Sequence, residues 1–182
     1  MTMKKNTKDS LWVGACTGLM LAGLCFLGIY ITHCFGEMPL GRFQLAFTWP
    51  LFFCCFSVGV YFFREYRNEG AVSVREAFSI CLVATFTASL CFGLSVYTFF
   101  ELNPEVFDKH QQMLFEFYNR SAKELGKELG AAETATLHQR LTATTCADIA
   151  QHESFKFLGI GVVFTLIVGL VFKKRKVIQV EA

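Results

Sequence analysis

Four long stretches of this 182-residue chain contain no aspartate, glutamate, lysine or arginine: Leu11–Thr32, Phe43–Phe63, Ala77–Phe100 and Phe157–Phe172. A helix rises about 1.5 Å per residue and a hydrocarbon core is about 30 Å thick, so each stretch can cross a bilayer, the fourth one barely. Transporters, pumps and proton relays normally carry an ionisable group at membrane depth. The missing charges therefore indicate membrane spans and speak against chemistry inside them.

The sequence also lacks the short motifs that bind metals, phosphates or nucleic acids. No Cys-x-x-Cys occurs, and no two of the histidines form a His-x-x-x-His pair: His33, His110, His138 and His152. No glycine-rich phosphate loop follows a strand, and residue order indicates no Ser-His-Asp arrangement. The basic runs adjoin apolar stretches, where they meet lipid headgroups rather than nucleic acid. We expect no catalytic residue, metal site or cofactor, no nucleic-acid partner, and no enzymatic activity.

Positive charge is segregated along the chain. Ten basic residues lie before the first stretch, between the second and third, or after the fourth: Lys4, Lys5, Lys8, Arg64, Arg67, Arg75, Lys173, Lys174, Arg175 and Lys176. The opposite side holds Arg42 and six basic residues spread through Glu101–Lys156, a segment that also carries nine acidic residues. The positive-inside rule therefore predicts cytoplasmic termini and an external segment 101–156.

Composition agrees with a membrane location. Apolar residues make up 53% of the chain, including 21 phenylalanines, whereas about 45–50% is usual in soluble domains. Trp12 and Tyr30 stand at opposite ends of the first stretch, where interfacial aromatic rings are favoured. We predict an all-α membrane protein with four transmembrane helices, both termini in the cytoplasm, and one domain over residues 1–182.

Small residues recur at four-residue intervals in three of the spans: Gly14, Gly18 and Ala22; Cys81, Thr85, Ser89 and Gly93; Gly161, Thr165 and Gly169. Small faces let helix backbones approach closely in lipid, where no hydrophobic effect separates a helix from the acyl chains. We interpret these faces as contacts within one compact bundle. A homodimer seam is the alternative.

The chain has eight cysteines, of which six lie inside the spans, where they act as small apolar side chains: Cys16, Cys25, Cys54, Cys55, Cys81 and Cys91. Only Cys34 and Cys146 reach the predicted external side, where a disulfide could form. A quinone-linked thiol oxidoreductase needs a reactive Cys-x-x-Cys pair and a second pair to exchange with it. A structural Cys34–Cys146 bridge is therefore favoured over redox catalysis.

The external segment contains two helical patterns. Asn103-Pro104-Glu105 reads as a helix start, and apolar residues then recur at helical intervals to Leu129, before Gly130. A second, weaker pattern covers Glu133–Gln151. The two helices can pair as a hairpin. Alternatively, the apolar cluster around Leu114, Phe117 and Tyr118 docks a partner or lies on the outer leaflet.

The turn between the second and third spans is compact and of mixed charge. Gly70 can supply a positive φ angle, and Ser73 with Glu76 forms a capping-box pattern at the start of the third span. We interpret the turn mainly as a folding device. If the chain docks a cytoplasmic component, the surface at Arg67 and Gly70 is the first candidate.

Four short pieces carry a family resemblance: the glycine-rich stretch Gly14–Gly28, Tyr66-Arg67 followed by Gly70, Val72-Ser73-Val74 leading into Glu76-Ala77-Phe78, and Asn103-Pro104. Together they resemble the bacterial inner-membrane protein family known as domain of unknown function (DUF) 4199. The chain departs from that pattern at Asn103, where Asp is expected, and in its many cysteines. The resemblance implies a four-span inner-membrane protein with an external helical segment. It carries no established activity and therefore no catalytic residue.

Three functional hypotheses follow from these observations. The leading one is a non-enzymatic accessory or scaffold protein that offers its external helices to an envelope partner. The second is a small-solute transporter or channel subunit, in which a homo-oligomer lines a pore with Thr85 and Ser89. The third and weakest is the thiol oxidoreductase. The sequence specifies neither a substrate nor an oligomeric state.

Overall fold

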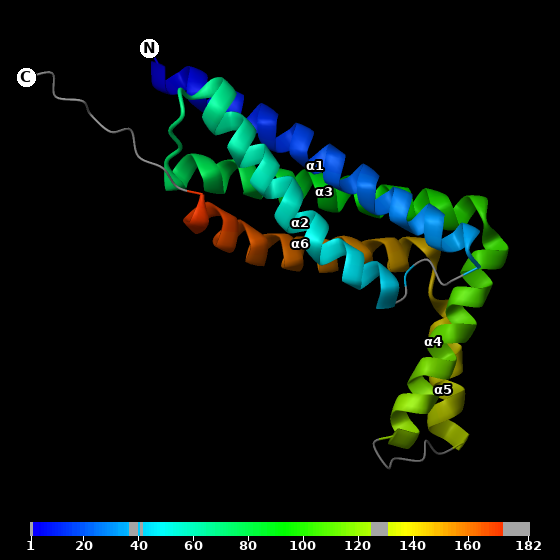
Figure 1. Ribbon diagram of the computed structural model, residues 1–182. Coiled ribbons are helices and arrows are strands. Elements are labelled where there is room, and N and C mark those ends of the chain that lie inside the picture. The colour runs from blue at the N-terminus through cyan, green and yellow to red at the C-terminus, as the bar shows by residue number, and fades with distance from the viewer. Residues whose placement is uncertain (1, 37–39, 41, 125–130, 173–182) are drawn as a thin grey trace, which may run out of the picture. The chain divides into compact units, whose positions relative to one another are not determined.

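The computed structural model describes residues 2–36, 40, 42–124 and 131–172, and within them the side chains at 7–36, 40, 46–121, 135–136 and 139–172. Every regular element in these ranges is a helix: α1 (Thr2–Cys34), α2 (Arg42–Phe62), the π-helix η1 (Phe63–Arg67), α3 (Val74–Leu102), α4 (Pro104–Glu124), α5 (Ala131–Ala143) and α6 (Cys146–Val171) (Figure 1). The predicted all-α fold is confirmed.

Among the described residues, four helical segments are long and apolar enough to cross a membrane: Thr7–Cys34, Ala46–Arg67, Val74–Leu102 and Cys146–Val171. They coincide with the four predicted spans and extend them at most ends. Contacts group the chain into two compact units. The bundle unit comprises Met1–Gly93 and Glu153–Ala182, and the hairpin unit comprises Leu94–His152. The single domain over 1–182 stays a prediction.

Successive helices of the bundle unit run in opposite directions. The beginning of α1, the turn between η1 and α3, and the last residues of α6 all lie at one end of this unit (Figure 1). Of the basic residues that the sequence predicts to be cytoplasmic, Lys8 and those of the α2–α3 connection therefore lie toward the same end of the bundle unit.

The core of the bundle unit is a cluster of phenylalanine rings from three helices. Phe52 and Phe56 of α2 and Phe92 of α3 are fully buried, and Phe157 of α6 is 2% exposed. The Phe52 and Phe157 ring centroids lie 5.1 Å apart, and those of Phe52 and Phe56 lie 5.5 Å apart. Such aromatic contacts add to dispersion packing, which holds helices together in lipid.

Glycines let the helices of the bundle unit approach one another closely. A Cβ atom at Gly14 would lie 2.7 Å from the backbone oxygen of Ile80, and one at Gly18 would lie 2.6 Å from that of Ala84. A Cβ atom at Gly161 would collide with the Thr85 side chain. The small faces of α1, α3 and α6 therefore serve packing within the chain, as predicted, and these glycines are not available for a homodimer seam.

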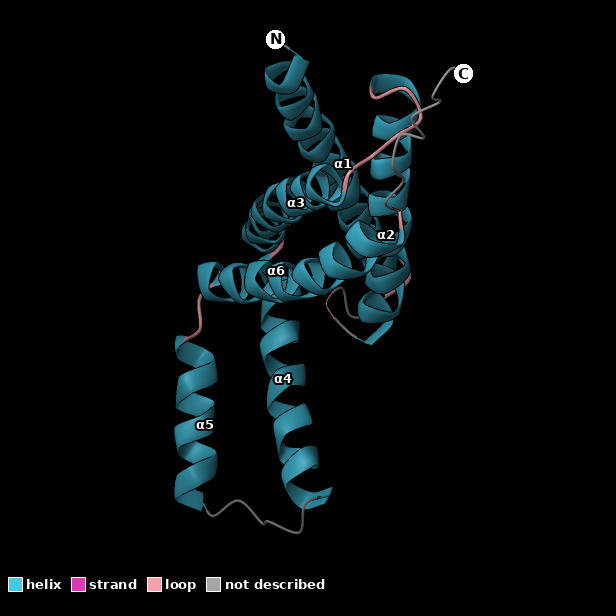
Figure 2. Ribbon diagram, turned by 90° about the vertical axis from the view of Figure 1, so that its left-hand side faces the viewer, coloured by secondary structure: helices cyan, strands magenta, loops and turns pink. Residues whose placement is uncertain are grey.

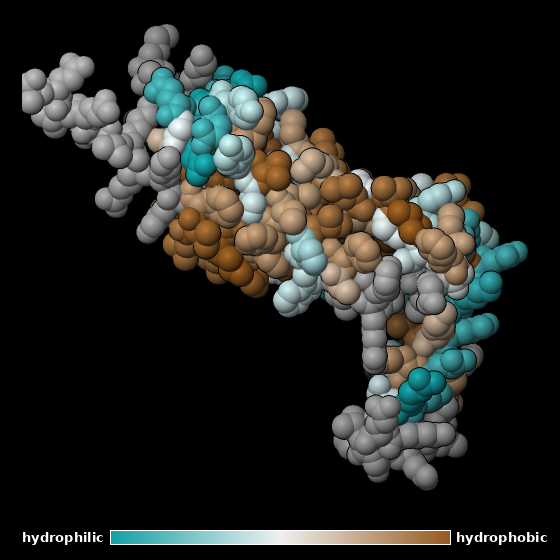
Figure 3. Space-filling model, in the orientation of Figure 1, coloured by the Kyte–Doolittle hydropathy of each residue, from teal (hydrophilic) through white to brown (hydrophobic). Residues whose placement is uncertain are grey.

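The outward surface of the bundle helices is apolar. Figure 3 shows hydrophobic residues along the visible flank and hydrophilic ones near the end that carries the η1–α3 turn. Large exposed side chains on this unit include Leu19 of α1, Phe86 and Leu90 of α3 and Leu166 of α6. Soluble proteins rarely expose apolar surface on this scale, so the distribution fits lipid-facing helices.

The fourth spanning helix begins earlier than predicted. Thr145 and Asp148 form a capping box, in which the Thr145 amide donates to Asp148 Oδ2 at 2.8 Å and the Asp148 amide donates to Thr145 Oγ1 at 3.3 Å. This cap starts α6 at Cys146 and separates it from α5. The single helix predicted over Glu133–Gln151 is therefore wrong, since two helices share that range.

This early start corrects a second expectation. Glu153 and Lys156 lie inside the helix that contains the fourth span, and their side chains form an ion pair at 2.5 Å. Glu153 is 7% exposed, so its carboxylate is held within the protein. The fourth candidate span thus carries this charge pair as well as Asp148 near its start, and the run Phe157–Phe172 leaves all three out. Pairing is the usual condition under which a buried charge is tolerated.

In the hairpin unit, α4 and α5 lie side by side (Figure 2). Gln111 Nε2 of α4 donates to the Thr144 backbone oxygen, just beyond α5, at 2.9 Å. The buried ring of His110 and the ring of Phe107 both contact Phe100, with centroid distances of 5.4 and 5.7 Å. The two helices pair with each other, which is one of the two arrangements that the sequence left open. The predicted end of its first helix at Leu129 and Gly130 lies outside the described residues.

Candidate functional site

The connection between α2 and α3 has unusual backbone geometry. The last residues of the second span form the π-helix η1, and π-helical turns occur frequently at functional sites. Gly70 adopts the predicted positive φ of 77°, and the Gly70 amide donates to the Arg64 backbone oxygen at 2.8 Å. Glu69 also has a positive φ, of 51°, which costs a non-glycine residue roughly 1 kcal/mol.

The start of α3 is fixed by the predicted capping box. The amide and the hydroxyl of Ser73 donate to Glu76 Oε2 at 2.9 and 2.8 Å, and the Glu76 amide donates to Ser73 Oγ at 3.3 Å. Asn68 Nδ2 donates to the Ala71 backbone oxygen at 2.9 Å. Ala71 and Val72 are buried. The connection is therefore an ordered turn, in agreement with its predicted role as a folding device.

The charges of this connection differ in how they are compensated. Arg64 Nε donates to Glu65 Oε1 at 2.7 Å, and the Arg64 guanidinium lies 5.1 Å from the Tyr61 ring centroid. The Glu76 carboxylate accepts the capping hydrogen bonds of Ser73. Arg67, in contrast, makes no hydrogen bond and no ion pair with any other residue that the structure describes.

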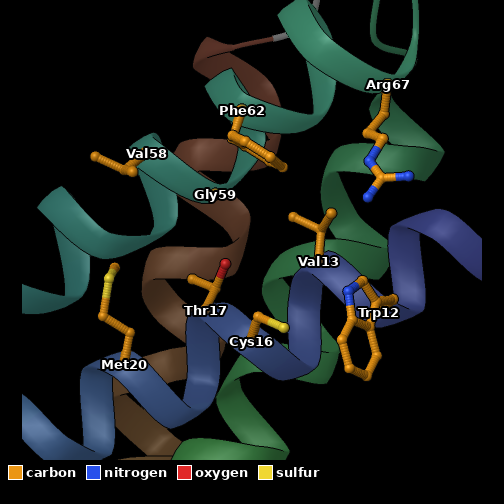
Figure 4. Close-up of a pocket in the computed structure, with 9 residues that line it drawn as sticks. All are labelled: Trp12, Val13, Cys16, Thr17, Met20, Val58, Gly59, Phe62 and Arg67. Atoms are coloured by element: carbon orange, nitrogen blue, oxygen red, sulfur yellow. The ribbon is translucent and has the colours of Figure 1, made fainter.

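Arg67 lies at the mouth of a groove between α1 and the α2–η1 segment. The groove has a volume of about 310 Å³, and α1 contributes Trp12, Cys16 and Met20, whereas α2 contributes Val58 and Phe62. Figure 4 shows the Arg67 side chain extending from the end of η1 toward Trp12 and Val13 of α1. The groove is therefore apolar along its walls and cationic at one end.

The sequence predicted Trp12 as an interfacial ring and Arg67 as part of a candidate docking surface, but it did not predict that the two line the same groove. The four-residue spacing of Lys8, Trp12, Cys16 and Met20 puts these residues on one stripe of α1, which is a signal that the sequence does contain. The spacing does not tell which helix packs beside this stripe. In the structure that helix is α2, which approaches α1 closely at Gly59, where a Cβ atom would collide with Thr17.

A second groove between α1 and α2 provides a comparison. It has a volume of about 230 Å³, and its walls include Leu27 and Ile31 of α1 and Phe47 and Leu51 of α2. None of the described side chains that line it is charged. Both grooves are bounded by the same two helices, so among the described residues the cation at Arg67 is the feature that distinguishes the first one.

The predicted partner residues of α4 have different exposures. Phe117 is 53% exposed and Tyr118 is 48% exposed, and their ring centroids lie 6.0 Å apart. Met113, one turn before Phe117, is 43% exposed. Leu114 is half-buried. Of the predicted trio, Phe117 and Tyr118 form the accessible apolar surface, while Leu114 is partly covered within the hairpin unit.

The predicted pore-lining hydroxyls are buried within the bundle unit. Thr85 Oγ1 donates to the Cys81 backbone oxygen at 2.9 Å and lies 3.3 Å from Thr165 Oγ1 of α6. Ser89 Oγ donates to the Ser154 backbone oxygen at 2.7 Å. These residues therefore join α3 to α6 of the same chain and do not form an open face at which an oligomer could line a pore.

The two cysteines predicted to be external lie at helix ends. Cys34 is the last residue of α1 and is exposed, and Cys146 is the first residue of α6. Both are free thiols, so the bridge between them stays a prediction. Within the described residues, no three His, Cys, Asp or Glu side chains gather closely enough to hold a metal ion.

Comparison with known proteins gives one result. The family described as "Protein of unknown function (DUF4199)" matches residues 16–174. Neither the curated proteins nor the solved structures include a match to this chain. The matched range takes in most of the first candidate span and all of the other three, together with the α2–α3 connection and the α4–α5 hairpin.

Proposed function

This chain belongs to the family described as "Protein of unknown function (DUF4199)", and from that premise we propose that it is a non-enzymatic accessory or scaffold protein of a bacterial inner membrane. Its four spans anchor the chain, and its α4–α5 hairpin offers an apolar surface to an envelope partner. Both termini and the η1–α3 turn face the cytoplasm, in accord with the positive-inside distribution of Lys and Arg.

The observation that supports this role is the surface left open by the hairpin. One apolar stripe of a helix cannot serve two surfaces fully. Here Gln111 and His110 occupy the contacts inside the hairpin unit, and Met113 and Phe117 remain exposed one helical turn apart. Exposed aromatic and methionine side chains are enriched at protein interfaces. A membrane platform with an open aromatic face on its external helices suits a docking role.

Photo-crosslinking in intact cells tests this role. A photoreactive residue replaces Met113 or Phe117 in turn, and matched controls carry it at Gln112 and Glu116, which are exposed polar positions on the same helix. We expect one protein adduct of constant mass at Met113 and Phe117, and its absence at the two controls. Phe117→Asp introduced beside the Met113 probe is expected to abolish the adduct.

The same experiment has outcomes that overturn the proposal. Adducts with lipid alone would assign the aromatic face to the outer leaflet, and adducts with a second copy of this chain alone would assign it to self-association. An adduct that forms equally at Gln112 and Glu116 would show proximity without recognition. None of these results would contradict the predicted membrane topology, because that prediction rests on the four spans and on the distribution of Lys and Arg.

A further inference from the structure

We propose that the groove between α1 and the α2–η1 segment binds one anionic phospholipid molecule, with its phosphate at Arg67 and an acyl chain along the apolar walls. This inference is independent of the role proposed for the α4–α5 hairpin. It rests on three observations within the bundle unit: a guanidinium with no ion pair among the described residues, an apolar groove that leads away from it, and an interfacial tryptophan beside it.

The guanidinium supplies the charge complementarity. Arg64 is paired with Glu65, whereas Arg67 has no ion pair among the described residues. A planar guanidinium forms two parallel hydrogen bonds with phosphate oxygens, a geometry that lysine cannot reproduce. Lys8 is exposed and lies one helical turn before Trp12 on the same stripe of α1, outside the groove, and is followed by the half-buried Asp9. The ligand is therefore expected to carry a phosphate without a compensating headgroup cation.

The walls supply the second half of the ligand. Val13 and Met20 of α1 and Val58 and Phe62 of α2 face the groove, and its volume of about 310 Å³ falls within the range of small-molecule sites. A free phosphate ion would gain nothing from these walls, and an uncharged acyl compound would leave Arg67 unpaired. A phospholipid satisfies both ends at once. Basic pockets between spanning helices are known to hold acidic lipid headgroups.

The position of Trp12 agrees with a headgroup at this level. Tryptophan is favoured at the membrane interface, where its ring contacts acyl chains and its N–H reaches water or headgroups. Trp12 is 64% exposed and lies beside the Arg67 side chain in Figure 4. The second groove, between Leu27 and Phe47, has apolar walls and no charge on the described side chains that line it, and we assign it no such ligand.

Fluorescence quenching of Trp12 tests the proposal on the full-length protein. The chain has two tryptophans, so Trp49→Phe leaves Trp12 as the only reporter. The protein is reconstituted in phosphatidylcholine vesicles that contain increasing fractions of brominated phosphatidylglycerol or of brominated phosphatidylcholine. We expect the anionic lipid to reach half-maximal quenching at a mole fraction about fivefold lower, as one favourable Arg–headgroup contact implies.

Three variants separate a specific site from general surface attraction. Arg67→Gln is expected to bring the ratio between the two lipids to about one, and Arg67→Lys to leave an intermediate ratio. Arg75→Gln, which removes an exposed charge near the start of α3 and outside the groove, is expected to keep the full ratio. Trp12→Phe leaves Trp49 as the reporter, and we expect no preference there.

Several outcomes would overturn the proposal. A ratio of about one in the Trp49→Phe protein would mean that Arg67 selects no lipid. A full ratio that persists in Arg67→Gln would mean the same. If Arg75→Gln lowered the ratio between the two lipids as much as Arg67→Gln does, the preference would come from general surface charge. Displacement of the anionic lipid by inorganic phosphate would assign the site to a free oxyanion. If Arg67→Gln fails to fold, the intermediate ratio of Arg67→Lys decides the matter, and a full ratio there would contradict phosphate recognition by the guanidinium.

Discussion

The ring of Phe92 in α3 stacks on the ring of Phe157 in α6, with centroids 4.0 Å apart and planes inclined by 14°. Both side chains are almost completely buried, and Phe52 of α2 contacts Phe157 from another side. The three rings join three helices that are far apart in the sequence. This cluster therefore links the second, third and fourth spans of the bundle unit.

Phe157→Ala is expected to lower the free energy of unfolding by about 3–5 kcal/mol, because it removes a buried ring and leaves a cavity. Leu90→Ala on α3 is the control, since Leu90 is 67% exposed and its truncation is expected to change stability by less than about 0.5 kcal/mol. The free energies of unfolding of both variants are measured in mixed micelles that contain increasing fractions of a denaturing detergent. Equal losses of stability in the two variants would mean that the buried ring stack contributes no more than an exposed leucine side chain.

Gly18→Ala and Gly23→Ala form a matched pair on α1. A Cβ atom at Gly18 would lie 2.6 Å from the Ala84 backbone oxygen, so we expect a loss of about 1–3 kcal/mol. A Cβ atom at Gly23 meets nothing within 4 Å, and alanine is the better helix former by about 1 kcal/mol, so stability stays the same or rises. Thermal unfolding in detergent separates the two. A stable Gly18→Ala protein would contradict the close α1–α3 packing.

Lys156→Met is expected to destabilise the protein more than the double variant Glu153→Gln/Lys156→Met. The single change leaves the buried Glu153 carboxylate without its partner, whereas the double change removes the charge as well. Because the Lys156 side chain is 38% exposed and water can partly replace it, we expect a difference of about 1–3 kcal/mol. A double variant that is no more stable than the single one would show that the ion pair lies in water.

Membrane orientation is tested with thiol labelling in intact cells. In a background without other cysteines, the exposed Cys34 at the end of α1 is expected to react with a membrane-impermeant maleimide. A cysteine placed at Glu65, which is exposed in η1, is expected to react only after the cells are opened. This prediction follows from the positive-inside rule. The reverse pattern would invert the topology and place the α4–α5 hairpin in the cytoplasm.

Local patterns in the sequence predicted local structure well. The capping box of Ser73 and Glu76 and the positive φ of Gly70 were legible because each involves residues within one turn. The break before α6 was equally local, since Thr145 and Asp148 have the same capping spacing, but the weak apolar stripe of Glu133–Gln151 obscured it. The Thr-x-x-Asp pattern was the signal that could have located it.

The candidate groove could not be predicted in the same way. Arg67 was identified as a surface residue and Trp12 as an interfacial anchor, yet which flank of α2 faces α1 depends on the contact between Gly59 and Thr17. Likewise, the spacing of Thr85 and Ser89 indicates a small polar face without saying which helix covers it. The structure assigns that face to α6.

The sequence by itself determined that this protein has four apolar helices, a capped turn after the second and a helical segment before the fourth. Charge-free length and turn chemistry are properties of contiguous residues, and lipid excludes most alternatives for such stretches. Only the tertiary structure decided which small faces meet, that the Glu153 side chain is buried, and that Arg67 stands at the mouth of an apolar groove. Those outcomes depend on how side chains from distant segments fit together, and helix periodicity does not encode that fit.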